Sequence, residues 1–442
     1  MRPLPAKGRQ TPTGTWVRTL ARIFHTPMET PTLRRVRARG LQARITTPVG
    51  RVPSRGARGC EISGLEGYLA FRPNPLPPPL EWKPRLVKAL ASASTLAGRL
   101  AGEGRRLPNP HILIRPFVRR EAVLSSRIEG TQVTLGELLA AEAGATVERS
   151  PDDLREVGNY VTALEYGIQR LKALPLSLRL VRELHGKLMC GVRGGHATPG
   201  EFRRSQNWIG PPGCTLADAS FVPPPPDALM DHLGAWEKFL HDQSLPPLVH
   251  AALAHYQFET VHPFLDANGR VGRLLITLQL CQRDVLPMPL LYLSAFFEAT
   301  RQHYYRGFRD VRERGDWTGW LLYFLNGVAR QSEDALSRSE RINSLLTRWR
   351  EGLGGASAQC ARDLVNLLGG NPFITARGAE EKLNVAYNTA IRAIGQLEAA
   401  GIVKEISEAK RHRVWCAKSL LDILEEPARL EVWEPDPPTA AR

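Results

Sequence analysis

Apolar residues recur at intervals of three and four along most of the chain between residues 86 and 345, for example at Leu154, Val157, Val161 and Leu164. This spacing is typical of amphipathic helices, which bring such positions onto one face. The segment 200–213 interrupts the pattern with Gly and Pro residues and has no helical period, which favours a short hairpin or flap. The sequence therefore predicts a mainly α-helical fold with one β-hairpin flap.

The net charge of +15 is concentrated at the N-terminal end. Residues 1–60 hold 13 Lys and Arg residues and one Glu, whereas the remainder of the chain holds 46 basic and 43 acidic residues. Because this leader is rich in Arg, Pro and Gly and lacks periodicity, we predict that residues 1–60 are disordered. A transit peptide and a region translated from too early a start codon share this composition, and we favour the second origin.

The remaining sequence indicates a protein of the cytoplasm. No stretch approaches the roughly 20 apolar residues needed to cross a bilayer. The six cysteines are dispersed and none has zinc-ligand spacing, so we expect free thiols in a reducing compartment. A Pro-rich arm and a helix are predicted for 61–110, with the extended part at 72–80, and the main helical domain for 111–350.

Residues 355–418 follow a different pattern. Helices are expected near 361–368, 376–383 and 386–400, with Gly401 as a cap, and the alternation from 402 to 415 is typical of a two-stranded wing. This resembles a winged helix-turn-helix, and residues 426–442 are expected to form a frayed tail. Such modules bind DNA or other proteins, and the sequence leaves both kinds of partner open. The residues expected to contact the partner are Asn384, Tyr387, Asn388, Arg392, Lys410, Arg411, His412 and Arg413.

The segment His262-Pro-Phe-Leu-Asp-Ala-Asn-Gly-Arg-Val-Gly-Arg273 passes directly into an apolar helix. A polar, Gly-containing loop that opens a helix presents unpaired N–H groups and the positive end of the helix dipole, which together bind phosphates. Arg270 and Arg273 stand one turn apart there and can hold the same polyphosphate. Asp266 suits a Mg2+ ion beside phosphates, and His262 suits a proton acceptor near neutral pH. These parts predict phosphoryl or nucleotidyl transfer.

This segment resembles the signature of the Fic family, His-x-Phe-x-(Asp/Glu)-Gly-Asn-Gly-Arg-x-x-Arg, and departs from it at Ala267. The resemblance covers residues 72–330 and implies a Fic (Fido) helical domain that transfers AMP from ATP to a Ser, Thr or Tyr hydroxyl of a target protein. It implies that His262 deprotonates this hydroxyl, that Phe264 is core and that Asp266 binds Mg2+. The implied nucleotide-binding residues are Asp266, Ala267, Asn268, Gly269, Arg270, Val271, Gly272 and Arg273. If φ is positive at Ala267, its Cβ costs roughly 1 kcal/mol.

A second motif, Ser125-Ser-Arg-Ile-Glu-Gly130, ends a helix expected over 116–130. Gly130 is a candidate for the left-handed residue after the helix, and Ser125 and Glu129 stand one turn apart. The motif resembles the inhibitory sequence of the same family, (Ser/Thr)-x-x-x-Glu-(Gly/Asn). The resemblance implies that Glu129 pairs with Arg273, which removes the clamp for the γ-phosphate of ATP.

Two further groups of residues match the family less specifically. The flap residues Asn207, Trp208, Ile209 and Gly210 would lie over the phosphates and align a target segment by strand addition. Tyr304 and Tyr305 would lie near the nucleotide, although one of them is expected to be a core residue. For His185, His250 and His255 we expect core or surface roles, because their spacing matches no metal site.

The sequence leaves two alternative functions open. The same site would remove AMP from a modified protein if Glu129 positioned a water molecule. A DNA-binding regulator that senses nucleotide is the other alternative, and His262 argues against it because a sensor needs no base. Self-modification and a homodimer are both compatible with the sequence.

Overall fold

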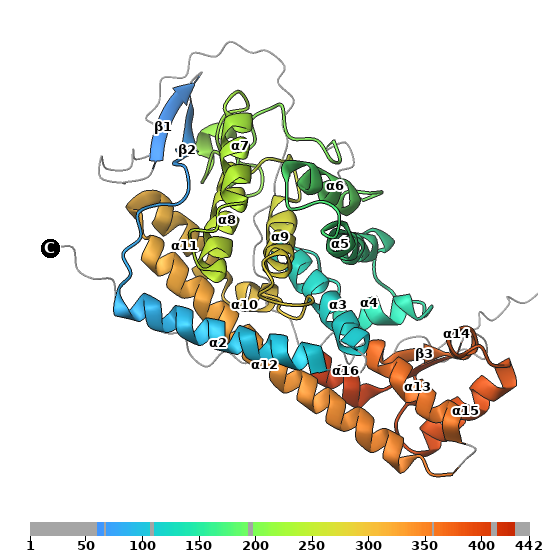
Figure 1. Cartoon of the computed structure of the whole chain (residues 1–442). Helices are drawn as coiled ribbons and strands as arrows, with labels where there is room; N and C mark the ends of the chain where they lie inside the picture. The colour runs from blue at the N-terminus through green and yellow to red at the C-terminus, as the bar shows by residue number, and fades with distance from the viewer. Residues whose placement is uncertain are drawn as a thin grey trace, which may run out of the picture.

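The computed structural model describes residues 60–65, 68–106, 110–192, 198–355, 358–407 and 413–428. Two long helices, α2 (Pro84–Arg106) and α12 (Trp317–Gly352), lie side by side along one edge of the molecule (Figure 1). The other helices of the main domain are α3 (Pro110–Ile128), α4 (Leu135–Glu142), α5 (Pro151–Arg170), α6 (Leu178–Leu188), α7 (Leu229–Leu240), α8 (Pro247–Val261), α9 (Asn268–Gln282), α10 (Ser294–Ala299) and α11 (Arg301–Arg314). The predicted mainly α-helical fold is confirmed. The predicted leader, apart from Cys60, and the tail from residue 429 lie outside the described residues.

Helices α8 and α9 form the buried centre of this domain, and nearly every residue of both helices is enclosed. The apolar residues on all sides of these two helices explain why neither shows a strongly amphipathic pattern. The segment 262–267 joins them in a tight turn, so both helix ends meet at one place. No helix in the described ranges is both long and apolar enough to cross a membrane. The five cysteines whose side chains the structure describes have free thiols, as expected: Cys190, Cys214, Cys281, Cys360 and Cys416.

An antiparallel hairpin, which the sequence analysis did not predict, precedes the Pro-rich arm. Its strands are β1 (Cys60–Leu65) and β2 (Tyr68–Pro73), with Cys60 opposite Pro73. The arm then runs along the helices in extended form, as predicted. Proline removes backbone N–H groups but keeps the carbonyls, and a carbonyl attaches the arm here. The Asn74 carbonyl accepts from Gln257 Nε2 at 3.0 Å.

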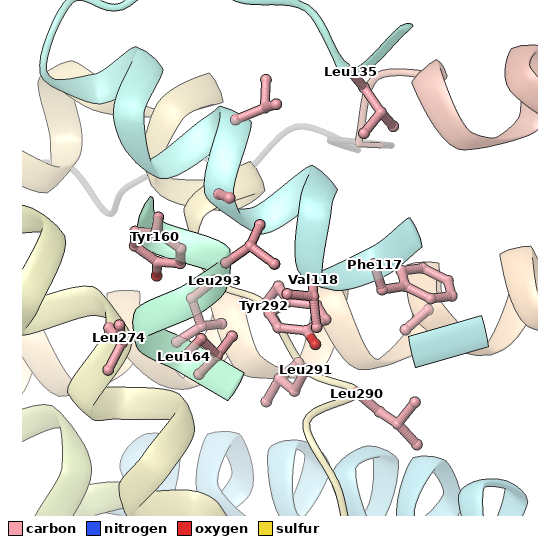
Figure 2. Packing of buried hydrophobic residues seen from close by; sticks show 14 of the residues in the cluster. Phe117, Val118, Leu135, Tyr160, Leu164, Leu274, Leu290, Leu291, Tyr292 and Leu293 are labelled. Carbon is pink, nitrogen blue, oxygen red and sulfur yellow. The ribbon is translucent and has the colours of Figure 1, made fainter. Parts of the chain in front are cut away.

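The helix expected over 116–130 is longer than predicted at its N-terminal end. It begins at Pro110, and Pro116 lies inside it. A proline inside a helix removes one backbone hydrogen bond, and here the packing of α3 against α5, α10 and α13 offsets that loss. Figure 2 shows part of the core around α3, with Val118 beside Leu291 and Tyr292 of the segment that precedes α10.

The predicted flap is reduced to a single β-bridge. Ile209 and Phe221 exchange two backbone hydrogen bonds of 2.8 and 3.0 Å, and the loop between them contains the short 3-10 helix η1 (Leu216–Asp218). The turn is therefore longer than the segment 200–213 in which it was expected. Prolines at 211–212 and 223–226 provide no backbone N–H groups, which explains why the ladder does not extend on either side.

The C-terminal unit contains helices close to the three predicted positions: α13 (Gln359–Gly370), α14 (Ala376–Leu383) and α15 (Tyr387–Ala399). Its strands β3 (Phe373–Thr375), β4 (Lys404–Glu405) and β5 (Val414–Cys416) form an antiparallel sheet in the order β3-β5-β4. Strand β3 and the last helix, α16 (Lys418–Glu425), were not predicted. Gly401 has a φ of 68° after α15, as expected for its cap. Lys410, Arg411 and His412 lie outside the described residues, and the assignment as a winged helix-turn-helix stays a prediction.

The C-terminal unit shares one hydrophobic core with the main domain. Helices α13 and α16 pack on α3, and the Asn371 side chain donates to the Leu139 carbonyl at 2.9 Å. Helix α3, which ends at Ile128, is thus covered on one side by the C-terminal unit (Figure 1).

Candidate active site

The turn between α8 and α9 has an unusual backbone. His262 has a φ of 49° and Ala267 a φ of 62°, and both lie in the left-handed region that favours glycine. The condition for strain at Ala267 is therefore met. The Asn268 side chain holds this turn closed, because it accepts from the Phe264 N–H and donates to the Phe264 carbonyl, each at 2.8 Å. Phe264 is fully buried, as predicted, and stacks on the His185 ring at 3.8 Å.

The surroundings of His262 favour the neutral form of its ring. Its Nδ1 lies 3.1 Å from the Glu259 carbonyl, which fixes the proton on that nitrogen. Its Nε2 is buried and has no hydrogen-bond partner within the part of the chain that the structure describes. Burial, reinforced by the charge of Arg203, lowers the pKa of His262 to about 4. The Nε2 lone pair is consequently available at neutral pH.

Three residues that the sequence analysis did not place at the site support this turn, and one of them, His185, was expected to have a core or surface role. The buried Arg203 side chain donates to the His262 carbonyl at 3.0 Å and to the Pro224 carbonyl at 2.5 Å. His185 Nδ1 accepts from the Gly200 N–H at 2.8 Å, and its Nε2 faces the Asp266 carbonyl at 3.3 Å. The third residue, Glu156 on α5, forms an ion pair with Arg270. These contacts join segments distant in the sequence, and no local pattern marks them.

The first turn of α9 has unpaired N–H groups of the kind expected for an anion site. The Val271 N–H makes the first intrahelical bond, to the Ala267 carbonyl at 3.0 Å, so the N–H groups of Asn268, Gly269 and Arg270 precede the helical ladder. Because the Asn268 side chain is engaged with Phe264, its contribution to a phosphate would come from the backbone. A Cβ at Gly269 would lie 2.2 Å from Glu129 Oε1, so this position requires glycine in the observed state.

Arg270 and Asp266 lie at the edge of this anion site. Arg270 forms an ion pair of 2.7 Å with Glu156, which also accepts from the Thr131 hydroxyl at 3.0 Å. Asp266 lies 3.8 Å from Arg270, and its side chain is 39% exposed. A single accessible carboxylate beside a phosphate site fits Mg2+, which takes most of its ligands from water and substrate phosphates. No group of three or more metal-ligating side chains occurs in the described ranges.

The predicted contact between Glu129 and Arg273 is present. The two side chains are 2.6 Å apart, and Arg273 also donates to the hydroxyl and the carbonyl of Ser125 at 2.9 and 3.0 Å. Burial raises the pKa of Glu129, but the charge and hydrogen bond of Arg273 outweigh this effect and the pKa is lowered. Glu129 is held by the expected helix ending: Gly130 has a φ of 106°, and its N–H and that of Thr131 donate to the carbonyls of Arg127 and Ser126.

Among the flap residues and the two tyrosines, Asn207 and Tyr304 are buried and Tyr305 is exposed. Asn207 is buried, and its amide supports the turn by donating to the carbonyls of His262 and Phe264. Trp208 donates to the Cys214 carbonyl, and Gly210 follows the bridge at Ile209. Tyr304 is a core residue bound to His255 at 2.8 Å, whereas Tyr305 is 42% exposed. Val271 is fully buried.

Comparison with known proteins agrees with this geometry. Residues 87–169 match the model of the Fic/DOC family N-terminal region, and residues 175–280 match the Fic/DOC family model. The Protein adenylyltransferase Fic of Drosophila virilis is 33% identical over 170 residues, which cover 36% of this chain and 32% of that protein. The corresponding protein of Drosophila ananassae is 31% identical over 170 residues, with coverage of 36% and 31%.

The matched region therefore spans about a third of the length of these curated relatives. A crystal structure of a Fic family protein from Desulfovibrio desulfuricans G20 superposes with a TM-score of 0.52 at 19% identity, and covers 77% of this chain and 98% of that chain. This likeness shows that the fold is shared. Two family models match in sequence, one over the helix that ends at Ile128 and one over the turn that carries His262, so residues 87–280 are similar to the Fic/DOC family.

Proposed function

We propose that this protein is an adenylyltransferase that moves AMP from ATP to a hydroxyl group of a target protein. One observation carries the proposal: His262 is neutral, and its buried Nε2, in the turn before α9, has no hydrogen-bond partner among the described residues. The names of the curated relatives support the same activity. In the reaction, Nε2 takes the proton of a Ser, Thr or Tyr hydroxyl as its oxygen bonds to the α-phosphorus. The bond from that phosphorus to the β-phosphate oxygen breaks, and pyrophosphate leaves.

The phosphates of ATP would be held by the N-terminal end of α9. Its first N–H groups and the guanidinium groups of Arg270 and Arg273 supply positive charge on one side of the turn. Asp266 would hold Mg2+, which neutralises phosphate charge when bound. The Ile209 bridge would align the target segment beside the site. Tyr305, which is partly exposed near the Glu129–Arg273 pair, would lie beside the nucleotide.

We further propose that Glu129 inhibits the transferase. Its carboxylate occupies Arg273 at 2.6 Å, so the γ-phosphate cannot take that guanidinium. Without this contact the triphosphate would not present its α-phosphorus in line with the target hydroxyl. The C-terminal unit is a second binding surface in this proposal, for DNA or a protein, with Tyr387 exposed at the start of α15.

The test is incorporation of label from α-labelled ATP with Mg2+. Glu129→Gly should raise self-modification or target modification strongly over the natural chain, because every catalytic group remains. Glu129→Gly combined with His262→Ala should be silent while ATP still binds, and Glu129→Gly combined with Arg273→Ala should lose most activity. Equal labelling with and without His262 would disprove the mechanism, and an unchanged rate for Glu129→Gly would disprove the inhibition.

The ionised state of Glu129 favours one alternative reaction on the same site. A carboxylate that is 30% exposed beside the phosphate site could orient a water molecule for removal of AMP from a modified protein. Incubating an AMP-modified target with the natural chain and with Glu129→Gly separates the two reactions. Release of AMP that disappears in the variant would assign Glu129 this role, and no release by either chain would exclude it.

A further inference from the structure

The segment that leads into the flap, residues 200–207, contains a buried charge, and we call this segment the flap root. Arg203 is 3% exposed, and its guanidinium group donates to the backbone carbonyls of Ser205, Pro224, Val261 and His262. Within the part of the chain that the structure describes, no carboxylate pairs with it. Burial lowers the pKa of Arg203 to about 10, so the group keeps its charge at neutral pH. A buried charge that only carbonyl groups compensate costs free energy, so its position calls for a physical reason.

The flap root binds the carbonyls of the turn that carries His262. The Arg203 backbone N–H donates to the Pro263 carbonyl at 2.9 Å, and its Nε donates to the His262 carbonyl at 3.0 Å. Asn207 donates to the His262 carbonyl at 3.3 Å and to the Phe264 carbonyl at 2.9 Å. His262 has a φ of 49°, and a residue with a Cβ keeps this left-handed conformation only when its surroundings fix it. The contacts of the flap root provide this support.

We propose that Arg203 is a positioning residue that joins the flap to the proton acceptor and so aims His262 at the hydroxyl group of the target. Ile209, beside which the target segment would pair, lies two residues after Asn207. One short loop would therefore set both the place of the target hydroxyl and the direction of the imidazole that receives its proton. This inference rests on the proposed function, because it specifies how the base meets the target.

The charge of Arg203 acts on the same imidazole ring. Burial lowers the pKa of His262, and the hydrogen bond to the Glu259 carbonyl raises it. Two charged groups act as well: Arg203 lowers this pKa and Glu129 raises it. A nearby cation disfavours the protonated ring, so Arg203 favours the form that accepts a proton. Loss of the Arg203 charge should therefore raise the pKa of His262, whereas loss of an uncharged donor should not.

The test is made in a Glu129→Gly chain, by label transfer and by calorimetry with ATP. Arg203→Met keeps the length of the side chain but removes its donors and its charge. Its kcat should fall about a hundredfold while its affinity for ATP stays that of the parent chain. Arg204→Met is the matched control, because this neighbour loses the same charge from a side chain that is 90% exposed, and its kcat should not change. A kcat of Arg203→Met equal to that of the parent would overturn the proposal.

NMR titration of the His262 ring separates the charge of Arg203 from its contacts and does not depend on catalysis. The ring signal is identified by its absence from the His262→Ala spectrum. Arg203→Met should raise the pKa of the ring, whereas Arg203→Lys keeps the charge and should leave that pKa near the parent value. An equal rise in the Met and Lys variants would overturn the proposal, because it would show that the site had only opened to water.

A second variant decides the case if Arg203→Met does not bind ATP. Asn207→Ala removes the other donor to the His262 carbonyl without a change of charge. It should lower kcat and leave both the affinity for ATP and the pKa of His262 unchanged, and a kcat equal to that of the parent would overturn the proposal. Label transfer by the Glu129→Gly parent tests the proposed function separately. If that transfer is absent, the proposed function fails, and the NMR titration still shows whether Arg203 acts on His262.

Discussion

His262 differs from an ordinary histidine in the pH range over which it accepts a proton. Burial lowers its pKa from 6.5 to about 4, and Glu129, which raises that pKa, is absent from the Glu129→Gly chain. Because the neutral form is the base, we expect kcat of this variant to stay level from pH 8 down to about 5 and to fall as the pH approaches 4. Label transfer at saturating ATP measures this profile. A midpoint near 6.5 would contradict the assignment of a buried base.

Ala267 stores strain that glycine would relieve. Its φ of 62° lies in the left-handed region, where a Cβ costs roughly 1 kcal/mol. Ala267→Gly should therefore raise the free energy of unfolding by about that amount, or leave it unchanged if the greater freedom of the unfolded chain cancels the gain. Urea unfolding measures the difference. Ala251→Gly, within the buried part of α8, is the control, and it should lower the free energy of unfolding by roughly 1 kcal/mol or more. A loss of similar size at Ala267 would show that its backbone is not strained.

Residues whose partners are close in sequence could be predicted, and residues with distant partners could not. His262, Asn268 and Arg270 belong to one loop and one helix turn, where spacing determines proximity. Glu129 and Arg273 are far apart in sequence, and their pairing followed from the resemblance. Arg203, by contrast, reaches the carbonyl of a residue 59 positions away, and its surroundings give no local sign of this contact.

The same distinction holds at the scale of elements. The ends of α14 and α15 agree with the predictions because they carry local signals, such as Thr375 at the N-terminal cap of α14 and Gly401 after α15. The predicted start of α3 was wrong, because tertiary packing maintains the helix through Pro116. Strand β3 has three residues and pairs with β5 some forty positions later, so its alternation is too short to recognise.

The guanidinium group of Arg301, on α11, holds the end of α3, and this contact gives a prediction for α3. The Arg301 side chain donates to the carbonyl of Ile128, the last residue of α3, and so fixes the turn that presents Glu129. Arg301→Ala should raise basal label transfer, but by less than Glu129→Gly, because the carboxylate remains and is only less well placed. Arg309→Ala, on the exposed face of the same helix, is the control. If Arg301→Ala activates the Glu129→Gly chain as well, Arg301 acts on something other than Glu129.

At the scale of the whole molecule, the C-terminal unit is an integral part of the fold. Its helices share the core with α3, and α16 ends against α12 and α3. Arg120 on α3 joins this contact through the Glu426 carbonyl at 3.3 Å and through Asp334 at 3.5 Å. A ligand on the C-terminal unit would therefore act on the helix that carries Ser125 without passing through a linker.

This integration predicts a single unfolding transition, with Arg338 as its test. Arg338 on α12 is 2% exposed, and it donates to Asp334 and to the carbonyls of Ile423, Glu426 and Pro427 at the end of α16. Arg338→Ala leaves these acceptors without their donor and should lower the free energy of unfolding by about 2–4 kcal/mol. Because the core is continuous, calorimetry should show one transition that moves to lower temperature as a whole. Arg392→Ala, whose side chain is exposed on α15, should leave the transition in place. An early, separate transition of the C-terminal unit in the Arg338→Ala chain would show that the two parts fold independently.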